Sequence, residues 1–179
     1  MIVYRIIKAD WYSNKRPCKG EVLTPPNYDI DNMPEGRKTT EERLETCRKE
    51  HFPQLNGRLD SIFVFPADKI EERAFHWASK FAPCLNDSCQ CYLLKLETKE
   101  PVIWHDASFF EDLSHAYKRE NALMKHRMSG EDLMQNYWKA QHNIEDDCIE
   151  GLVKEVTIIS ISSYMVYHTC FKIMEEDIQ

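Results

Sequence analysis

The sequence predicts an α+β fold whose strands pair antiparallel. Short strand candidates and amphipathic helix candidates are mixed along the 179 residues without the regular strand–helix–strand repeat of a parallel sheet. Long irregular segments separate the short strands, which favours antiparallel sheets combined with helices. No internal repeat is visible and no linker divides the chain cleanly. We therefore expect a single domain over residues 1–179, with 25–38 as its weakest point.

The first half of the chain is expected to hold three strands and two helices. β-Branched and aromatic residues favour strands at 2–8, 21–24 and 61–65. One helix is predicted to begin at Thr39 or Thr40, either of which can be its N-cap, and to end near His51, ahead of the next proline. A second helix is predicted over 69–82 with Asp68 as its cap, because apolar residues recur there at helical spacing.

The second half alternates strands and helices less regularly. Strands are predicted at 91–97, 102–105, 149–153, 155–162 and within 164–173, and 155–162 has the strongest pattern. Asp106 can cap a further helix, and one or two helices are expected within 116–141. Their expected packing residues are Met124, Leu133, Tyr137 and Trp138.

Composition and charge exclude several functional classes. The net charge is −7 and no basic stripe is present, which argues against nucleic acid as a partner. Only five glycines occur, and no Gly-rich phosphate loop is found. No apolar run reaches about 18 residues and no signal peptide is evident, so we expect no membrane partner. Reduced thiols in the cytoplasm are the simplest interpretation of seven irregularly spaced cysteines.

The spacing of Cys84, Cys89 and Cys91 does not match a zinc site. Such sites prefer two CxxC pairs, whereas here no second pair follows. No HExxH motif occurs either. Cys91 opens an apolar strand, where thiols often serve as small core residues. We therefore predict no metal site.

Several short motifs occur in an order that is typical of one superfamily. They are Arg48, Phe52-Pro53, Arg58, Ser61, Phe63, Trp77-Ala78, Tyr137-Trp138 and Glu150-Gly-Leu-Val153. With these motifs the chain resembles the ADP-ribosyltransferase-like superfamily, and more specifically a family of uncharacterised bacterial proteins. The resemblance implies a split antiparallel β-sheet core with flanking helices. It also implies NAD as the substrate.

The resemblance assigns roles to residues on three strands. Tyr4 and Arg5 match the pair that holds the nicotinamide ribose or a phosphate, and Ser61 with Phe63 matches the wall of the nicotinamide pocket. Arg58 can bind a phosphate through its planar guanidinium. From the residues alone, Ser61 can equally end a turn, Phe63 can be core, and Arg58 can cap a carbonyl or pair with Asp60.

A catalytic glutamate at the start of a late strand completes the implied site. It binds the ribose 2′-hydroxyl and stabilises the oxocarbenium-like state that forms as nicotinamide leaves. Glu150 is the first candidate and Glu155 the second. On one extended strand, five residues apart, they would face opposite sides. The expected activity is ADP-ribosyl transfer or NAD hydrolysis, with an acceptor that the sequence does not specify.

Two non-enzymatic classes stay open, because the chain departs from the superfamily pattern. It has no E-x-E or Q-x-E pair and no S-T-S run. One alternative is a non-catalytic nucleotide-binding domain in which Arg5 and Arg58 bind phosphate. The other is a protein-interaction domain that presents an aromatic surface made of Trp11, Tyr12, Trp104 and Trp138.

Overall fold

A computed structural model describes residues 1–9, 16–81, 88–118, 126–139, 148–167 and 170–175, the last range by its backbone alone. The chain forms two compact units. Unit 1 comprises Met1–Thr24, Val64–Pro101 and Glu155–Gln179, and unit 2 comprises Pro25–Phe63 and Val102–Lys154. The first boundary falls where the segment 25–38 begins. Helices and antiparallel sheets occur together, so the predicted α+β class is confirmed.

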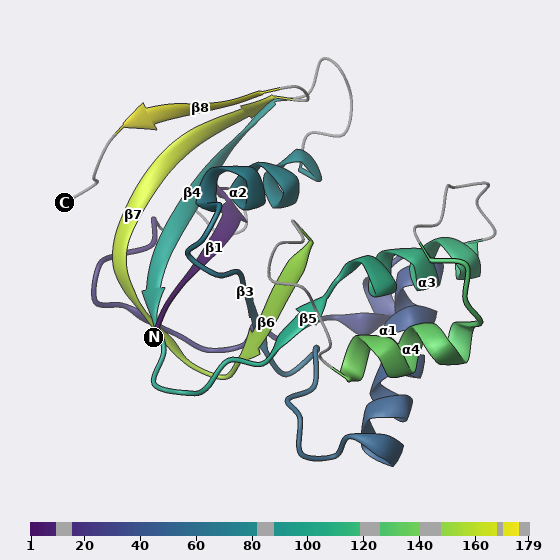
Figure 1. Ribbon diagram of the computed structural model, residues 1–179. Coiled ribbons are helices and arrows are strands. Elements are labelled where there is room, and N and C mark those ends of the chain that lie inside the picture. The colour runs from purple at the N-terminus through teal and green to yellow at the C-terminus, as the bar shows by residue number, and fades with distance from the viewer. Residues whose placement is uncertain (10–15, 82–87, 119–125, 140–147, 168–169, 176–179) are drawn as a thin grey trace. The chain divides into compact units, whose positions relative to one another are not determined.

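An antiparallel sheet forms most of unit 1 (Figure 1). Its strands lie in the order β1-β4-β7-β2, with β8 paired to β7. Their bounds are β1 Ile2–Lys8, β2 Val22–Leu23, β4 Ser88–Glu97, β7 Val156–Tyr167 and β8 Cys170–Glu175. The long β4 pairs with β1 along one edge, from Ile2 opposite Glu97 to Lys8 opposite Cys91, and with β7 along the other.

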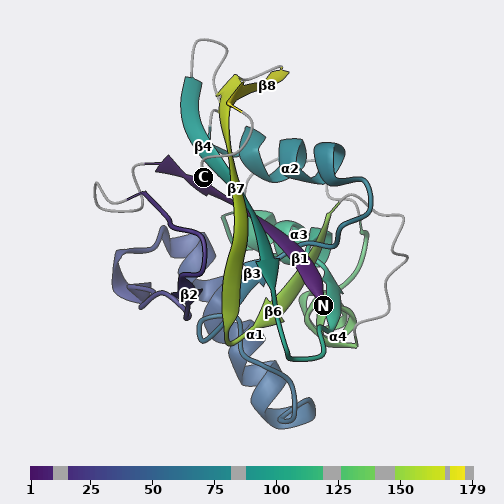
Figure 2. The same cartoon turned by 90° about the vertical axis from the view of Figure 1, so that its left-hand side faces the viewer.

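The helix α2 (Ile70–Ser79) packs against this sheet, as two perpendicular views show (Figure 2). Ala74 and Ala78 are fully buried against a cluster that includes Ile6, Leu93 and Val166. Two alanines one helical turn apart leave no bulk between the helix and the strands, so the backbones approach closely. Trp77, which lies beside them, is only partly buried at the margin of this core.

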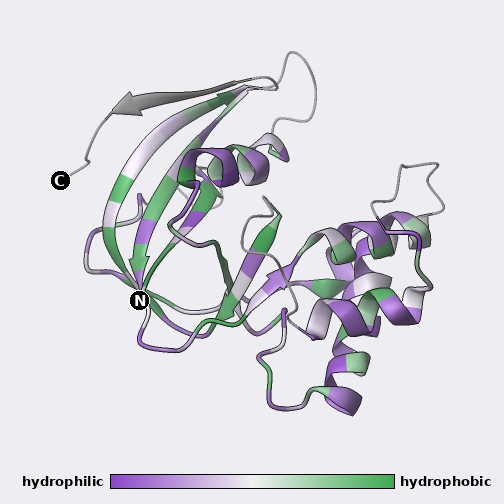
Figure 3. Ribbon diagram, viewed as in Figure 1, coloured by the Kyte–Doolittle hydropathy of each residue, from purple (hydrophilic) through white to green (hydrophobic). Residues whose placement is uncertain are grey.

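Unit 2 combines three helices with a small sheet. The helices are α1 (Glu35–His51), α3 (Ser108–Lys118) and α4 (Gly130–Trp138), preceded by the short 3₁₀ helix η2 (Ile30–Asn32). The strands β3 (Ile62–Val64), β6 (Ile149–Val153) and β5 (Trp104–Asp106) lie in that order, and β5 pairs antiparallel with β6. β6 is buried along its whole length and is largely hydrophobic, whereas α1 is mostly hydrophilic (Figure 3).

The core of unit 2 lies between its helices and β6. Leu44 of α1, Leu113 of α3 and Leu133 of α4 are each about 1% exposed and belong to one cluster. The indole nitrogen of the buried Trp138 donates a hydrogen bond to the carbonyl oxygen of Leu44, at 2.8 Å. This bond satisfies the polar end of a large side chain that would otherwise be costly to bury.

Gly151 makes β6 fit its surroundings. A Cβ atom at this position would collide with the side chain of Val102 and lie 2.8 Å from Cζ3 of Trp104. Only glycine allows the neighbouring residues to approach this strand so closely.

Three details of the predicted elements are wrong. α1 begins at Glu35 rather than after Thr39 or Thr40, because Pro34 occupies the N-cap position and its carbonyl accepts from the backbone N–H of Lys38 at 2.9 Å. The hydroxyl of Thr40 donates instead to the carbonyl of Gly36, at 2.6 Å. Lys69, with a φ of 48°, precedes α2 in place of Asp68, whose carboxylate accepts from Arg73 at 2.8 Å.

The third detail concerns Glu150 and Glu155, which do not share one extended strand. β6 ends at Val153 and β7 begins at Val156. Glu155 lies in the break between them and is exposed. The predicted residues Trp11, Tyr12, Cys84 and Met124 lie outside the described residues.

Candidate functional site

A buried arginine organises the polar interior of unit 2. Arg58 lies just ahead of β3, and its side chain is only 5% exposed. Its Nε donates to Oε2 of Glu41 on α1 at 2.9 Å, and its Nη2 lies 3.4 Å from Oε1 of the same carboxylate. Its Nη1 donates to the hydroxyl of Tyr137 on α4 at 2.7 Å, and to the carboxylate of Glu150 on β6.

Glu150 receives two donors on the same oxygen. The hydroxyl of Tyr137 donates to its Oε1 at 2.6 Å, and Nη1 of Arg58 donates to this atom as well. The residue is 3% exposed. Four side chains therefore form one hydrogen-bonded unit, which we name the Arg58 cluster: Glu41, Arg58, Tyr137 and Glu150.

Aromatic rings surround the guanidinium group. Its Cζ lies 4.0 Å from the ring centre of Phe110, 4.7 Å from that of Phe63 and 5.2 Å from that of Tyr137. Such contacts stabilise a cation through the negative face of each ring. Tyr28 meets Phe63 edge to face, with ring centres 6.0 Å apart. We name the three partly exposed rings, Tyr28, Phe63 and Phe110, the aromatic wall.

Burial and charge act in opposite directions on the Arg58 cluster. Burial by itself lowers the pKa of Arg58, but the negative charge of Glu41 and the neighbouring hydroxyl groups outweigh it, so the pKa rises above its ordinary value. Burial also raises the pKa of Tyr137 well above its ordinary value, although Arg58 opposes this. The arginine therefore stays charged, and the phenol stays neutral and donates a hydrogen bond to Glu150.

The net charge of the Arg58 cluster is negative when both carboxylates are ionised. Two carboxylates then face one guanidinium group, and the half-exposed Arg37 approaches Glu41 only at 4.0 Å. A buried site with excess negative charge favours a cationic group or a state that develops positive charge.

His105, which lies opposite Glu150 in the pairing of β5 with β6, supports Tyr137. Its ring stacks on the phenol at 4.9 Å with an interplanar angle of 14°, and its Nδ1 lies 2.9 Å from the carbonyl oxygen of Tyr137. Sequence reasoning did not identify Glu41, His105, Tyr28 or Phe110 as site residues. None of them belongs to a motif, and only the folded chain brings them together.

The predicted residues of unit 2 meet in this region with different roles. Arg58 and Glu150 are direct partners. Phe63 contacts both the core and the guanidinium group. Ser61 is fully buried, and its hydroxyl donates to the carbonyl of Gly57 at 2.6 Å, which is the turn role that the sequence left open.

Tyr4 and Arg5, the predicted binding residues of unit 1, contact or face residues of the same unit. Tyr4 stacks on Phe65, with ring centres 6.3 Å apart, and the backbones of the two residues exchange hydrogen bonds of 2.8 and 2.9 Å. Arg5 is half-buried on β1 opposite Leu94 of β4.

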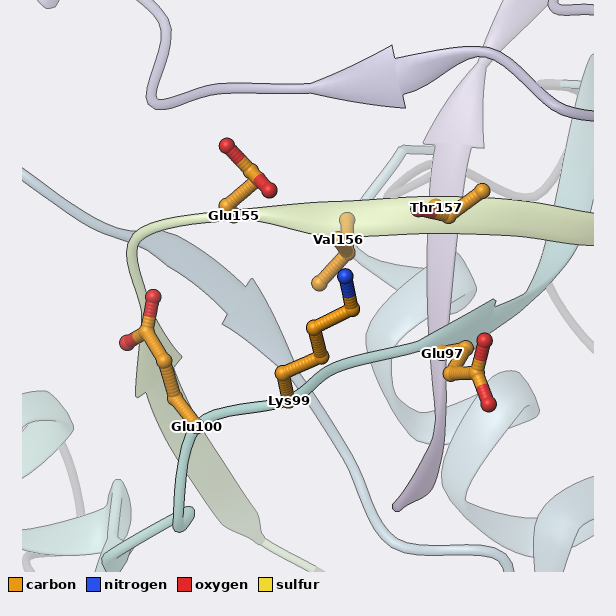
Figure 4. Close-up of a pocket in the computed structure, with 6 residues that line it drawn as sticks. All are labelled: Glu97, Lys99, Glu100, Glu155, Val156 and Thr157. Atoms are coloured by element: carbon orange, nitrogen blue, oxygen red, sulfur yellow. The ribbon is translucent and has the colours of Figure 1, made fainter.

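Glu155 lines a small pocket with Glu97, Lys99 and Glu100 (Figure 4). The pocket holds a volume of about 50 Å³. That space is enough for a water molecule or two but not for a nucleotide. Glu155 thus lacks the enclosed, hydrogen-bonded environment that surrounds Glu150.

The fold and the site define an α+β protein with a buried glutamate–arginine–tyrosine cluster behind a wall of partly exposed aromatic rings. Residues 27–164 match the family described as "Protein of unknown function (DUF2441)", and the chain belongs to this family. The matched segment contains the Arg58 cluster and the aromatic wall, whereas Tyr4 and Arg5 precede it. No curated protein sequence shows significant similarity to the chain. Across the described parts of the chain, no helix has the length and apolarity to cross a membrane.

Proposed function

We propose that the chain cleaves the bond between nicotinamide and ribose in NAD, with Glu150 as the catalytic carboxylate. ADP-ribose then passes to water or to another acceptor, as NAD glycohydrolases and ADP-ribosyltransferases do. The observation that carries this proposal is the fixed orientation of the Glu150 carboxylate, which is held by Tyr137 at 2.6 Å and by Arg58. The resemblance to the ADP-ribosyltransferase-like superfamily, stated from the sequence, also gives Glu150 as the first candidate for the catalytic glutamate.

The charge of the Arg58 cluster suits this chemistry. The nicotinamide ring of NAD is cationic, and positive charge moves onto the ribose as the bond breaks. A carboxylate that is already oriented in a poorly solvated site stabilises this charge without having to reorganise. Arg58 and Tyr137 are positioning residues in this scheme, because they hold Glu150 rather than the substrate.

The aromatic wall provides a surface for a flat ring. Phe63 and Phe110 lie directly against the guanidinium group of Arg58, and both are partly exposed, as is Tyr28. Offset stacking on such a surface contributes about 1 kcal/mol for each aromatic pair. Because Glu150 is 3% exposed, the ligand reaches it by displacing Phe63 or Phe110, the partly exposed rings that cover the guanidinium group bound to Glu150.

A second function is a non-catalytic one, either nucleotide binding or protein interaction. The observation that favours it is the near-complete burial of Arg58 and Glu150, whose polar atoms already bind each other. In that case the Arg58 cluster holds unit 2 together, and the partly exposed aromatic wall is the binding surface.

Nicotinamide release from NAD separates these functions. The purified full-length protein is incubated with NAD, and free nicotinamide is quantified by liquid chromatography. We expect turnover by the wild type and a loss on the order of 100-fold or more in Glu150→Gln. Glutamine keeps the size and the acceptor oxygen for Tyr137 but removes the charge. Glu155→Gln is the matched control, and it is expected to keep the wild-type rate.

Binding is followed separately by thermal unfolding with and without NAD. Saturation to ten times the dissociation constant stabilises the folded state by about 1.4 kcal/mol. A shift in both wild type and Glu150→Gln, with turnover only in the wild type, supports catalysis. A shift without turnover in either supports the nucleotide-binding function. Equal turnover in wild type and Glu150→Gln would rule out the assigned role of Glu150.

A further inference from the structure

Two cysteine thiols lie in contact on one face of β4 in unit 1. Cys89 and Cys91 are two residues apart, so their side chains project from the same side of the strand. Their Sγ atoms are 3.6 Å apart, which is the contact distance of two sulfur atoms, and neither forms a disulfide in the structure.

The two thiols differ in access. Cys91 is fully buried in the core cluster beneath α2, which also contains Ala78. Cys89 packs against the margin of that cluster and is only partly buried. A solvent-borne reagent therefore meets the sulfur of Cys89 first, and the sulfur of Cys91 lies directly behind it.

The strand geometry allows the two sulfur atoms to bond. Residues two apart on a strand have Cα atoms about 6.6 Å apart, near the upper end of the range that disulfides tolerate. β7 pairs with β4 at both positions, with Val166 opposite Cys89 and Tyr164 opposite Cys91, and holds this spacing; β1 reaches only as far as Cys91, opposite Lys8. A bond formed near the limit of the range is readily reduced, as is typical of reversible rather than structural disulfides.

We propose that Cys89 and Cys91 form a hydroperoxide-sensitive dithiol that closes to an intrastrand disulfide. The thiolate of Cys89 attacks a peroxide oxygen, so an S–O bond forms while the O–O bond breaks; when the peroxide is hydrogen peroxide, the departing hydroxide takes up the proton that the Cys89 thiol released and leaves as water. The thiolate of Cys91 then attacks the sulfenic sulfur. The S–S bond forms, the S–O bond breaks, and the departing hydroxide takes up the proton of the Cys91 thiol and leaves as a second water. Both sulfur atoms are oxidised and the peroxide is reduced.

Mass spectrometry of the oxidised full-length protein tests this assignment. After treatment with hydrogen peroxide, remaining thiols are alkylated and the protein is digested with trypsin. One tryptic peptide, residues 81–95, carries Cys84, Cys89 and Cys91. We expect this peptide to lose about 2 Da, for two hydrogen atoms, and to carry one alkyl group instead of three. Dithiothreitol is expected to restore all three alkylation sites.

Variants then locate the bond. Cys89→Ser and Cys91→Ser are each expected to abolish the mass loss, and Cys91→Ser is expected to leave a sulfenic acid on Cys89 that dimedone traps. Cys84→Ser is the matched control and is expected to keep the mass loss. Cys47, a buried thiol of unit 2, serves as a second reference and is expected to keep its alkylation.

Two results would overturn the assignment. One is an unchanged peptide at peroxide concentrations that oxidise a free thiol standard. The other is a bond that Cys84→Ser removes, since Cys84 would then be the partner. Fragmentation of the wild-type peptide identifies the bonded pair without any variant, because it shows which cysteine carries the single alkyl group. An alkyl group on Cys84 means that the bond joins Cys89 and Cys91.

Discussion

Replacing Arg58 with methionine tests how the Arg58 cluster contributes to stability. The side chain of Arg58 is 5% exposed, and that of Glu41 is 1% exposed. Removing the guanidinium group leaves the carboxylates of Glu41 and Glu150 buried without their cation. Breaking a buried ion pair by deleting one partner destabilises a protein by about 3–5 kcal/mol. We therefore expect a loss of about 4 kcal/mol, a large part of the 5–15 kcal/mol that is typical of folded proteins.

Urea unfolding followed by circular dichroism measures this loss. With a slope of about 2 kcal/mol per molar urea, the midpoint is expected to fall by about 2 M. The matched control is Lys38→Met, because Lys38 pairs at 2.9 Å with Asp31, whose side chain is 84% exposed. Exposed pairs contribute about 1 kcal/mol or less. Adding Glu41→Gln to Arg58→Met is expected to recover part of the loss.

The result that would refute this reasoning is a loss below about 1 kcal/mol for Arg58→Met, equal to that of the control. Such a result would mean that water reaches the two carboxylates. Arg58 would then not be the buried partner that orients Glu150.

Three further predictions concern single positions. Gly151→Ala is expected to destabilise the protein by about 1–3 kcal/mol in urea unfolding, because its Cβ collides with the neighbouring side chains. Gly130→Ala is the control and is expected to be nearly neutral, because its Cβ meets only ordinary contacts from 3.6 Å outward. Burial raises the pKa of Tyr137, so its contribution to stability is complete below the unfolded pKa of about 10 and is lost as the pH rises further. At neutral pH, Tyr137→Phe is expected to lower the free energy of unfolding by about 1.5–3 kcal/mol. Between pH 9 and about 11, the variant is expected to lose less stability than the wild type. The hydrogen bond from Arg48 lowers the pKa of Glu45, so this pair stabilises the fold above about pH 4.3 and weakens as the pH falls. In Arg48→Ala, the free energy of unfolding is expected to fall less steeply on acidification. An unchanged slope in urea unfolding measured across acidic pH would contradict this.

Local patterns predicted most elements but not the exact starts of the helices. The strand at 2–8 and the apolar run at 149–153 follow directly from their residues. The start of α1 was missed because Thr39 and Thr40 look like caps, while Pro34, which has no capping side chain, is the N-cap and the helix begins at Glu35, four residues or more earlier. Lys69 in a left-handed conformation is not a position that a sequence pattern identifies.

The candidate site was predicted in part. Arg58 and Glu150 were named from their motifs, and the structure makes them direct partners. Glu41 was not identifiable, because it is one of several acidic residues on a hydrophilic helix and only packing shows that it points inward. For the same reason, the pairing of Arg58 with Glu41 rather than Asp60 depends on a contact between residues 17 positions apart.

A crystal structure with a stable NAD analogue, in which carbon replaces the ribose ring oxygen, tests the proposed site most directly. Such an analogue binds but is not cleaved. The proposal predicts that its nicotinamide ring contacts Phe63 or Phe110 and that its ribose 2′-hydroxyl lies within hydrogen-bond distance of the Glu150 carboxylate. An analogue that binds elsewhere, with the Arg58 cluster unchanged and closed, would contradict the proposal.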